Sequence, residues 1–199
     1  MFSTGSTLGS RMNGFLNFLR RRIIERPAFL LHTSELVNHF LPIWEAWSNI
    51  GFDILLDGDV ELPKALLERG WDLRIRSVEE VLNTKDRYAV LVSNHPIRIP
   101  KEGRPDRKAM IKRLSQTNLR MMYAAGKSGW NMAYWNRLYG GVMCFGPCHA
   151  KEFSKRFGLP TVEIGYPRFD RYFNAVNDRE ELCSRTVHDS RRNSLRFWA

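Results

Sequence analysis

Apolar and polar residues alternate along the chain in short blocks that predict strands and helices in turn. Apolar runs of strand length occur at residues 29–33, 52–57, 71–75, 88–93, 119–125, 141–145 and 161–164. Between them, helical spacing and helix-start signals predict helices at residues 34–49, 62–70, 77–81, 106–114, 131–138, 147–158 and 171–183. This order predicts an α/β fold, a Rossmann-like parallel sheet with helices on both faces. The run Tyr88–Ser93 is apolar on both faces, which is typical of a covered parallel strand.

Capping residues mark the start of two of these helices. Ser34 is predicted as an N-cap with Glu35 favourable in the first turn, and Gly51 follows the end of that helix. Ser77 is predicted to cap a single helical turn.

The first 27 residues differ in composition, and we expect a flexible N-terminus that contains one amphipathic helix. Apolar positions predict this helix over Met12–Ile24, and it stops before Pro27. The arginines at 20–22 follow the apolar positions, which is not the order of a secretory signal. We expect the helix either to pack on the domain's own sheet or to lie on a membrane surface.

The net charge of the chain limits the classes of partner that we expect it to bind. The 199 residues carry a net charge of +10, and no apolar run is long enough to span a membrane. Three cysteines, an odd number, do not indicate a disulfide framework and fit a reducing compartment. Residues 98–127 form a basic stretch with two acidic residues, Glu102 and Asp106. Its basic residues are Arg98, Lys101, Arg104, Arg107, Lys108, Lys112, Arg113, Arg120 and Lys127. This stretch forms either a solvated face or a surface that attracts an anionic partner. No helix-turn-helix or RNA-recognition pattern accompanies it, so nucleic acid is not expected as the partner.

Candidate ligand contacts follow the predicted strands, because ligands of parallel α/β sheets bind at the carboxyl ends of the strands. These candidates are Ser93, Asn94, Gly126, Lys127, Ser128, Gly146, Pro147, Gly165, Tyr166, Pro167, Arg168 and Asp170. His95 follows a buried strand and is the candidate catalytic residue, as an acid–base group or a phosphate contact, with His32 a second histidine of the same kind. Hydrogen bonding of His95 to the neighbouring backbone is the structural alternative.

The sequence lacks the motifs of several common enzymatic chemistries. Gly126-Lys127-Ser128 is not a P-loop, because Met121 stands where that motif requires glycine. Neither a dinucleotide fingerprint nor a nucleophile elbow is present, and we expect no cofactor. Cys144, Cys148 and His149 lack a fourth ligand, so no metal is expected. The aromatic residues Trp130, Tyr134, Trp135 and Tyr139 recur at helical spacing, which predicts core or groove packing before base stacking.

The segment Tyr139–Phe173 contains three short motifs in a fixed order. They are Pro147-Cys148-His149-Ala150, Phe157-Gly158 and Gly165-Tyr166-Pro167-Arg168-Phe169-Asp170. In these motifs the segment resembles the CDP-glycerol glycerophosphotransferase family, the teichoic-acid-type polymerases. Similar loops occur in UDP-sugar glycosyltransferases and in nucleotide-sugar 2-epimerases.

The resemblance implies the N-terminal, acceptor-side domain of a bacterial GT-B transferase. On this view residues 28–175 form the Rossmann-like domain, and 176–199 are a helix and linker towards a donor domain that the chain lacks, so the chain alone is inactive. The implied donor is CDP-glycerol or another activated nucleotide, and the implied acceptor is a polyanionic or lipid-linked glycopolymer. The implied location is cytoplasmic, with peripheral contact to the cell membrane.

One departure from the family concerns the chemistry. The family carries a His-Gly-Thr-Pro-x-Lys stretch, and Ala125 stands here at the position of its histidine. No histidine role can therefore be transferred to that position, and the resemblance itself gives no such role to His95. A stand-alone binding module without catalysis, or half of a UDP-sugar glycosyltransferase or epimerase, remain as alternatives.

Overall fold

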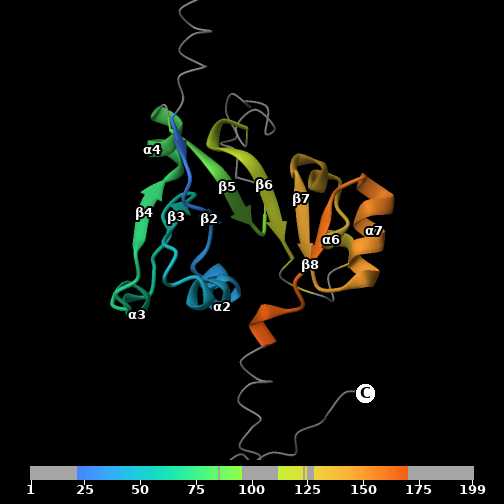
Figure 1. Cartoon of the computed structure of the whole chain (residues 1–199), viewed down its shortest axis with the longest axis horizontal. Coiled ribbons are helices and arrows are strands. Elements are labelled where there is room, and N and C mark those ends of the chain that lie inside the picture. The colour runs from blue at the N-terminus through green and yellow to red at the C-terminus, as the bar shows by residue number, and fades with distance from the viewer. Residues whose placement is uncertain (1–21, 85, 96–111, 123, 125–127, 170–199) are drawn as a thin grey trace, which may run out of the picture.

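The computed structural model describes residues 22–84, 86–95, 112–122, 124 and 128–169, and it confirms the α/β fold (Figure 1). A parallel sheet has the strand order β4-β3-β2-β5-β6-β7-β8, and β1 pairs with β5 beside that path. The strands are β1 (Ile23–Ile24), β2 (Ala28–Leu31), β3 (Phe52–Leu56), β4 (Leu73–Ser77), β5 (Arg87–Ser93), β6 (Ser115–Met121), β7 (Gly141–Cys144) and β8 (Thr161–Glu163). The helices are η1 (Ser34–Leu36), α2 (Val37–Ala46), α3 (Lys64–Leu67), α4 (Val78–Asn83), α6 (Ser128–Asn131), η2 (Tyr134–Leu138) and α7 (Pro147–Phe157).

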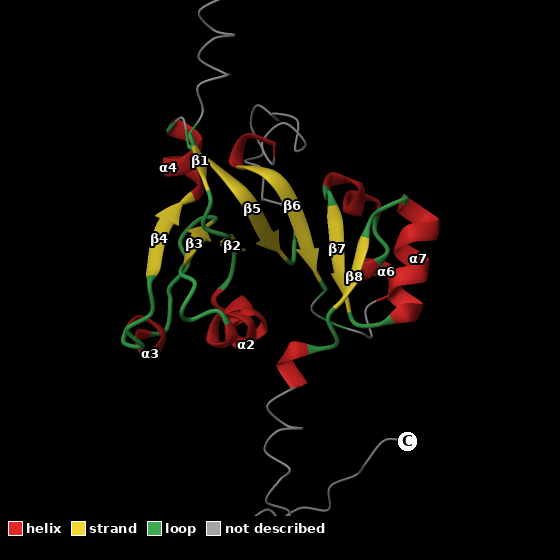
Figure 2. Ribbon diagram, viewed as in Figure 1, coloured by secondary structure: helices red, strands yellow, loops and turns green. Residues whose placement is uncertain are grey.

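The strand order reverses direction between β2 and β5. Strands β2, β3 and β4 extend the sheet one way, and β5 to β8 extend it the other way (Figure 2). Since every pairing is parallel, the carboxyl ends of β2 and β5 lie side by side at this reversal. A reversal of this kind opens a crevice at the carboxyl ends of the strands, which is where such sheets bind ligands.

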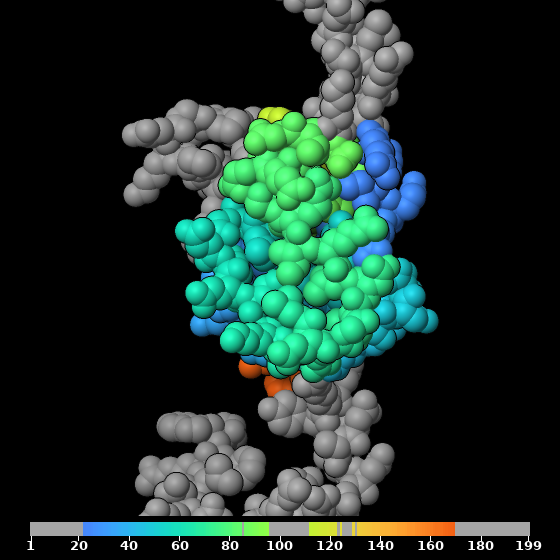
Figure 3. Space-filling view, turned by 90° about the vertical axis from the view of Figure 1, so that its left-hand side faces the viewer, coloured from blue at the N-terminus to red at the C-terminus, as the bar shows by residue number. Residues whose placement is uncertain are grey.

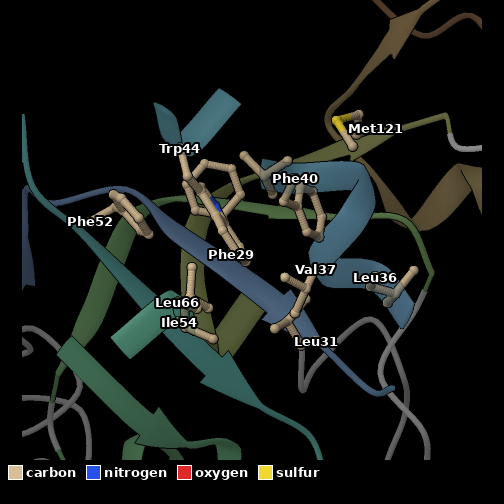
Figure 4. Close-up of a cluster of buried hydrophobic side chains, with 11 residues drawn as sticks. Phe29, Leu31, Leu36, Val37, Phe40, Trp44, Phe52, Ile54, Leu66 and Met121 are labelled. Carbon is tan, nitrogen blue, oxygen red and sulfur yellow. The ribbon is translucent and has the colours of Figure 1, made fainter. Parts of the chain in front are cut away.

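Helices cover both faces of the sheet, as the sequence predicts. Alternate residues of β2 enter two separate cores, because successive side chains of a strand point to opposite faces. Phe29 and Leu31 pack with α2 and α3, whereas Ala28 and Leu30 pack with α4. The first of these cores is rich in aromatic residues (Figure 4). A third cluster places Phe153 of α7 against β7.

The predicted amphipathic helix over Met12–Ile24 is wrong at its end, where Ile23 and Ile24 form β1. These residues pair with Arg87 and Tyr88 of β5, and Ile24 packs on the core beneath α4. Isoleucine is β-branched and favours a strand when a partner edge is available. The rest of the predicted helix, residues 12–21, lies outside the described residues, as do 171–183 and most of 106–114.

Other boundaries also differ from the sequence prediction. Ser34 is the first residue of η1 rather than an N-cap, and the cap position Thr33 makes no side-chain capping bond. Strand β6 begins at Ser115, ahead of the predicted start at 119. Residues 131–138 form parts of two short helices, because the side chain of Asn136 donates hydrogen bonds to the carbonyl groups of Asn131 and Ala133. The predicted cap at Ser77 is confirmed, since its Oγ accepts a hydrogen bond from the Glu80 N–H at 3.0 Å.

A charged cavity lies beside the β4 edge of the sheet. Residues 22–26 run alongside β4 and α4 (Figure 3), and with them they line a cavity of about 550 Å³. Arg26 reaches from this segment to the buried Asp53 on β3 and the exposed Asp72. Gly51 has a φ of 75°, and a Cβ at that position would collide with the Arg26–Asp72 pair. This glycine therefore serves both the backbone turn and the ion pair.

No helix within the described ranges is long and apolar enough to cross a membrane.

Candidate functional site

Two histidines from distant parts of the sequence meet at the reversal of strand order. His32 directly follows β2, and His95 lies two residues after β5. Their ring centroids are 5.1 Å apart, with an interplanar angle of 50°. Both residues are half-buried. The structure thus brings the predicted catalytic candidate and the second histidine together at the carboxyl ends of β2 and β5.

Ser93 and Asn94, at the end of β5, are hydrogen bonded to residues of other elements. The hydroxyl groups of Ser93 and Tyr139 are hydrogen bonded at 2.8 Å. The Asn94 Nδ2 group donates to the carbonyl of Met121 at 3.0 Å, which ties the end of β5 to the end of β6. Among the described residues, the buried Oδ1 atom of Asn94 has no hydrogen-bond partner. An orphaned buried acceptor of this kind is rare and costly.

Arg120 is fully buried, which corrects its place among the basic residues attributed to a solvated or anion-binding face. It shares a sheet row with Ser93 of β5 and Val142 of β7. Its guanidinium donates to the Asn131 carbonyl at 2.8 Å, to the Asn131 side chain at 3.0 Å and to the Asn136 side chain at 2.6 Å. Aromatic rings cover it, with Trp135 at 4.5 Å and Phe153 at 5.5 Å. The sequence signal for this site is the pair of asparagines, Asn131 at the end of α6 and Asn136 within η2.

Trp135 packs next to His95, and Tyr139 packs on Trp135. The Trp135 ring lies 5.4 Å from the His95 ring and 6.1 Å from the Tyr139 ring. Burial raises the pKa of the Tyr139 phenol well above its ordinary value of 10, against the opposing effects of the Ser93 hydrogen bond and the Arg120 charge. The sequence predicts that these aromatic residues pack in the core or in a groove. This prediction is confirmed for Trp135 and Tyr139, whereas Tyr134 is 72% exposed.

The raised tyrosine pKa predicts a loss of stability in alkaline solution. Burial also raises the pKa of Tyr88, with its hydrogen bond to Asp53 as the next cause. Below pH 10 both phenols are protonated whether the chain is folded or unfolded, so they add no pH dependence. Above pH 10 the unfolded chain releases these protons first, and each tyrosine lowers the free energy of unfolding by about 1.4 kcal/mol per pH unit.

Urea unfolding at several pH values between 8 and 11 would measure this slope. In Tyr139→Phe the slope above pH 10 is expected to decrease by the contribution of one proton. An unchanged slope in that variant would contradict the assignment to Tyr139.

A second group of predicted residues gathers at the ends of β7 and β8. Gly146 and Pro147 begin α7, and residues 165–168 follow β8 and enter a helical turn at 167–169 that the sequence interpretation treated as a loop. Tyr166 packs between Phe145, at 4.3 Å, and Phe169, at 4.6 Å. The turn lies on the side of the sheet towards which β5, β6 and β7 end (Figure 1).

The charge of Arg168 acts on a histidine of α2. Burial lowers the pKa of His39 on α2, and the positive charge of Arg168 lowers it further. Arg168 is itself exposed. The turn therefore presents an exposed guanidinium whose charge acts on the helix that follows β2.

Other predicted contacts lie outside the described residues. These are Gly126, Lys127 and Asp170, and the side chain of Ser128 at the start of α6. In the described part of the chain, no three His, Cys, Asp or Glu side chains are grouped as metal ligands. Cys144 is buried, which raises the pKa of its thiol, and the His149 ring packs on Phe145 at 5.7 Å.

Comparison with known proteins adds one distant match. No protein-family model matches the chain, and no curated protein matches it in sequence. A solved structure of the wall teichoic acid polymerase TagF, soaked with CDPG, matches at 13% identity and a TM-score of 0.46. The match covers 91% of this chain and 51% of that one, so the chain spans about half the length of TagF.

Proposed function

We propose that this chain is the acceptor-side domain of a transferase of the CDP-glycerol glycerophosphotransferase type. Its crevice at the carboxyl ends of β2 and β5 takes a phosphate-bearing glycopolymer, and a second domain supplies the activated nucleotide. The observation that carries this proposal is the meeting of His32 and His95 at the reversal of strand order. The motifs that resemble the family support it, since Gly146-Pro147 and Gly165–Arg168 follow strands of the same parallel sheet.

The residues at the carboxyl ends of the strands match what the transfer of glycerol phosphate requires. The attacking hydroxyl of the polymer needs a base, and an imidazole near neutral pH is the common choice. The phosphate groups of a polyanion need fixed positive charge, which the exposed Arg168 supplies. The packing of Trp135 and Tyr139 holds His95 in place for this task.

Binding to the full chain tests the proposal. Isothermal titration at low salt would compare poly(glycerol phosphate), CDP-glycerol and a UDP-sugar. We expect the polymer to bind and its affinity to fall about tenfold in Arg168→Gln, because one charged hydrogen bond contributes about 1.5 kcal/mol or more. Arg156→Gln is the matched control, because Arg156 is an exposed arginine at the opposite end of α7.

The alternatives predict different results. Binding of a UDP-sugar without binding of the polymer would favour half of a UDP-sugar glycosyltransferase or epimerase. If Arg156→Gln and Arg168→Gln weaken polymer binding equally, the binding depends on net charge alone. That result would contradict the proposed site at Arg168.

A further inference from the structure

The cavity beside the β4 edge occupies a gap in the sheet. Strand β1 pairs with β5 on one side, and among the described residues no strand pairs with it on the other side. Strand β3 runs beside β2 only, since it begins at Phe52 and the Asp53 N–H donates to the Pro27 carbonyl. The gap leaves a cavity of about 550 Å³ between residues 22–26, β4 and α4.

Two of the arginines that line this cavity are already hydrogen bonded to carboxylates. Arg26 donates to Asp53 at 2.9 Å. Arg76 donates to Glu80 at 2.8 Å and to Asp86 at 3.4 Å. These two guanidinium groups therefore compensate three of the carboxylates that line the cavity.

The other two lining arginines, Arg22 and Arg74, keep their hydrogen-bond donors available. Both are exposed, and neither guanidinium has a hydrogen bond or ion pair within the described ranges. Asp72 is hydrogen bonded to Arg26, which lowers its pKa, and the charge of Arg74 lowers that pKa further. The remaining lining carboxylate, Glu25, is exposed. The cavity thus offers two guanidinium groups against one carboxylate without an arginine partner.

Strand alternation directs both arginine side chains to the face of the sheet that contains the cavity. Arg74 pairs in register with Asp53, and it lies two residues before Arg76 on β4. Arg22 lies two residues before Ile24, whose side chain packs on the core beneath α4. Because alternate residues of an extended chain point to the same face, Arg22 and Arg74 approach the cavity from two different elements.

We propose that this cavity binds a small phosphate monoester and holds its dianionic phosphate group between Arg22 and Arg74. A guanidinium group donates two parallel hydrogen bonds to phosphate oxygens, and a phosphate charge of about −2 balances two guanidinium groups. The volume is larger than a phosphate ion needs and lies in the range of small-molecule sites, so the phosphate carries an organic group. This site lies at the β4 edge and not at the ends of β7 and β8, so the inference goes beyond the proposed function.

Calorimetric titration of the full chain at pH 7.5 and constant ionic strength tests the site. The probes are phenyl phosphate, inorganic phosphate and dimethyl phosphate, a diester that carries a single charge. We expect phenyl phosphate to bind more tightly than inorganic phosphate, because its ring fills part of the cavity. Dimethyl phosphate is expected to bind at least about tenfold more weakly than phenyl phosphate, because its smaller charge is attracted less strongly by two guanidinium groups.

Two substitutions and a control locate the phosphate. Arg22→Gln and Arg74→Gln are each expected to weaken the binding of phenyl phosphate about tenfold, because each removes one charged hydrogen-bonding group. Both residues are exposed, so these substitutions leave the core of the sheet intact. Arg156→Gln removes the same charge from α7, which packs on β7 in the other half of the sheet, and it is expected to leave the affinity unchanged.

Four outcomes would overturn the inference. The first is the absence of binding of both phenyl phosphate and inorganic phosphate. The second is equal weakening by all three substitutions, since the binding then depends on net charge alone. The third is dimethyl phosphate binding as tightly as phenyl phosphate. The fourth is phenyl phosphate binding that Arg168→Gln abolishes and that Arg22→Gln and Arg74→Gln retain, which would assign the phosphate to the proposed acceptor site.

Discussion

Phe29→Ala is expected to lower the free energy of unfolding by about 3–5 kcal/mol, because removing a fully buried phenyl ring loses its transfer energy and leaves a cavity. Phe29 is 1% exposed in the central strand β2. Its ring makes edge contacts with Phe40 at 5.2 Å, with Trp44 at 5.7 Å and with Phe52 at 5.7 Å (Figure 4). The rings come from three elements, so one truncation weakens the packing of α2 on β2 and β3 together.

Urea unfolding measures this loss, and Ile50→Ala is the control. Ile50 is 60% exposed, and its truncation is expected to change stability by less than about 0.5 kcal/mol. Phe29→Leu keeps most of the volume and is expected to cost about 1–2 kcal/mol. A loss below that of Phe29→Leu in the alanine variant would contradict the central place of this ring.

Arg26→Met is expected to destabilise the fold by about 3–5 kcal/mol, since it leaves a buried carboxylate without its ion-pair partner. The Arg26 Nε atom lies 2.9 Å from the Asp53 carboxylate, whose side chain is 2% exposed. The other Asp53 oxygen accepts a hydrogen bond from the Tyr88 hydroxyl at 2.7 Å. Tyr88 alone cannot compensate a full negative charge in the core of the sheet.

A double variant separates the charge effect from lost packing. Adding Asp53→Asn to Arg26→Met removes the orphaned charge, and we expect it to recover part of the stability that Arg26→Met loses. Asp72→Asn is the control, because Asp72 is the exposed partner of Arg26 and its loss is expected to have a much smaller effect. If the double variant is less stable than Arg26→Met, the charge is not the cause.

The local pattern of the sequence predicts the sheet because each strand carries its own signal. The apolar residues of β2, β3, β5 and β7 appear as short runs, and Ser77 marks the start of α4. Strand β6 starts at Ser115 with the polar residues Gln116 and Thr117, and both are exposed. Pairing with β5 imposes this start, and such pairing is a non-local effect that propensity does not contain.

The candidate site was only partly accessible to sequence reasoning. His95 follows a recognisable buried strand, so its place at a strand end could be predicted. Its partner could not be chosen, because which strand neighbours β5 depends on the strand order and not on any local pattern. The sequence predicts Arg120 on a solvated or anion-binding face, since an arginine in a basic stretch is normally solvated. Its burial depends on Asn131 and Asn136, whose amide groups replace water as hydrogen-bond acceptors.

The strand order also affects when His32 and His95 come together during folding. β2, β3 and β4 pair among themselves, as do β5 to β8, and in the described part of the chain the two groups join where β5 meets β1 and β2. A nascent chain can complete the first group while β5 is still inside the ribosome. His32 and His95 stand on opposite sides of this seam, so their rings meet only when the two groups of strands dock. That docking joins Phe29 to Val92 across a long stretch of chain, and contacts of this type form slowly, so the two histidines are expected to come together late in folding.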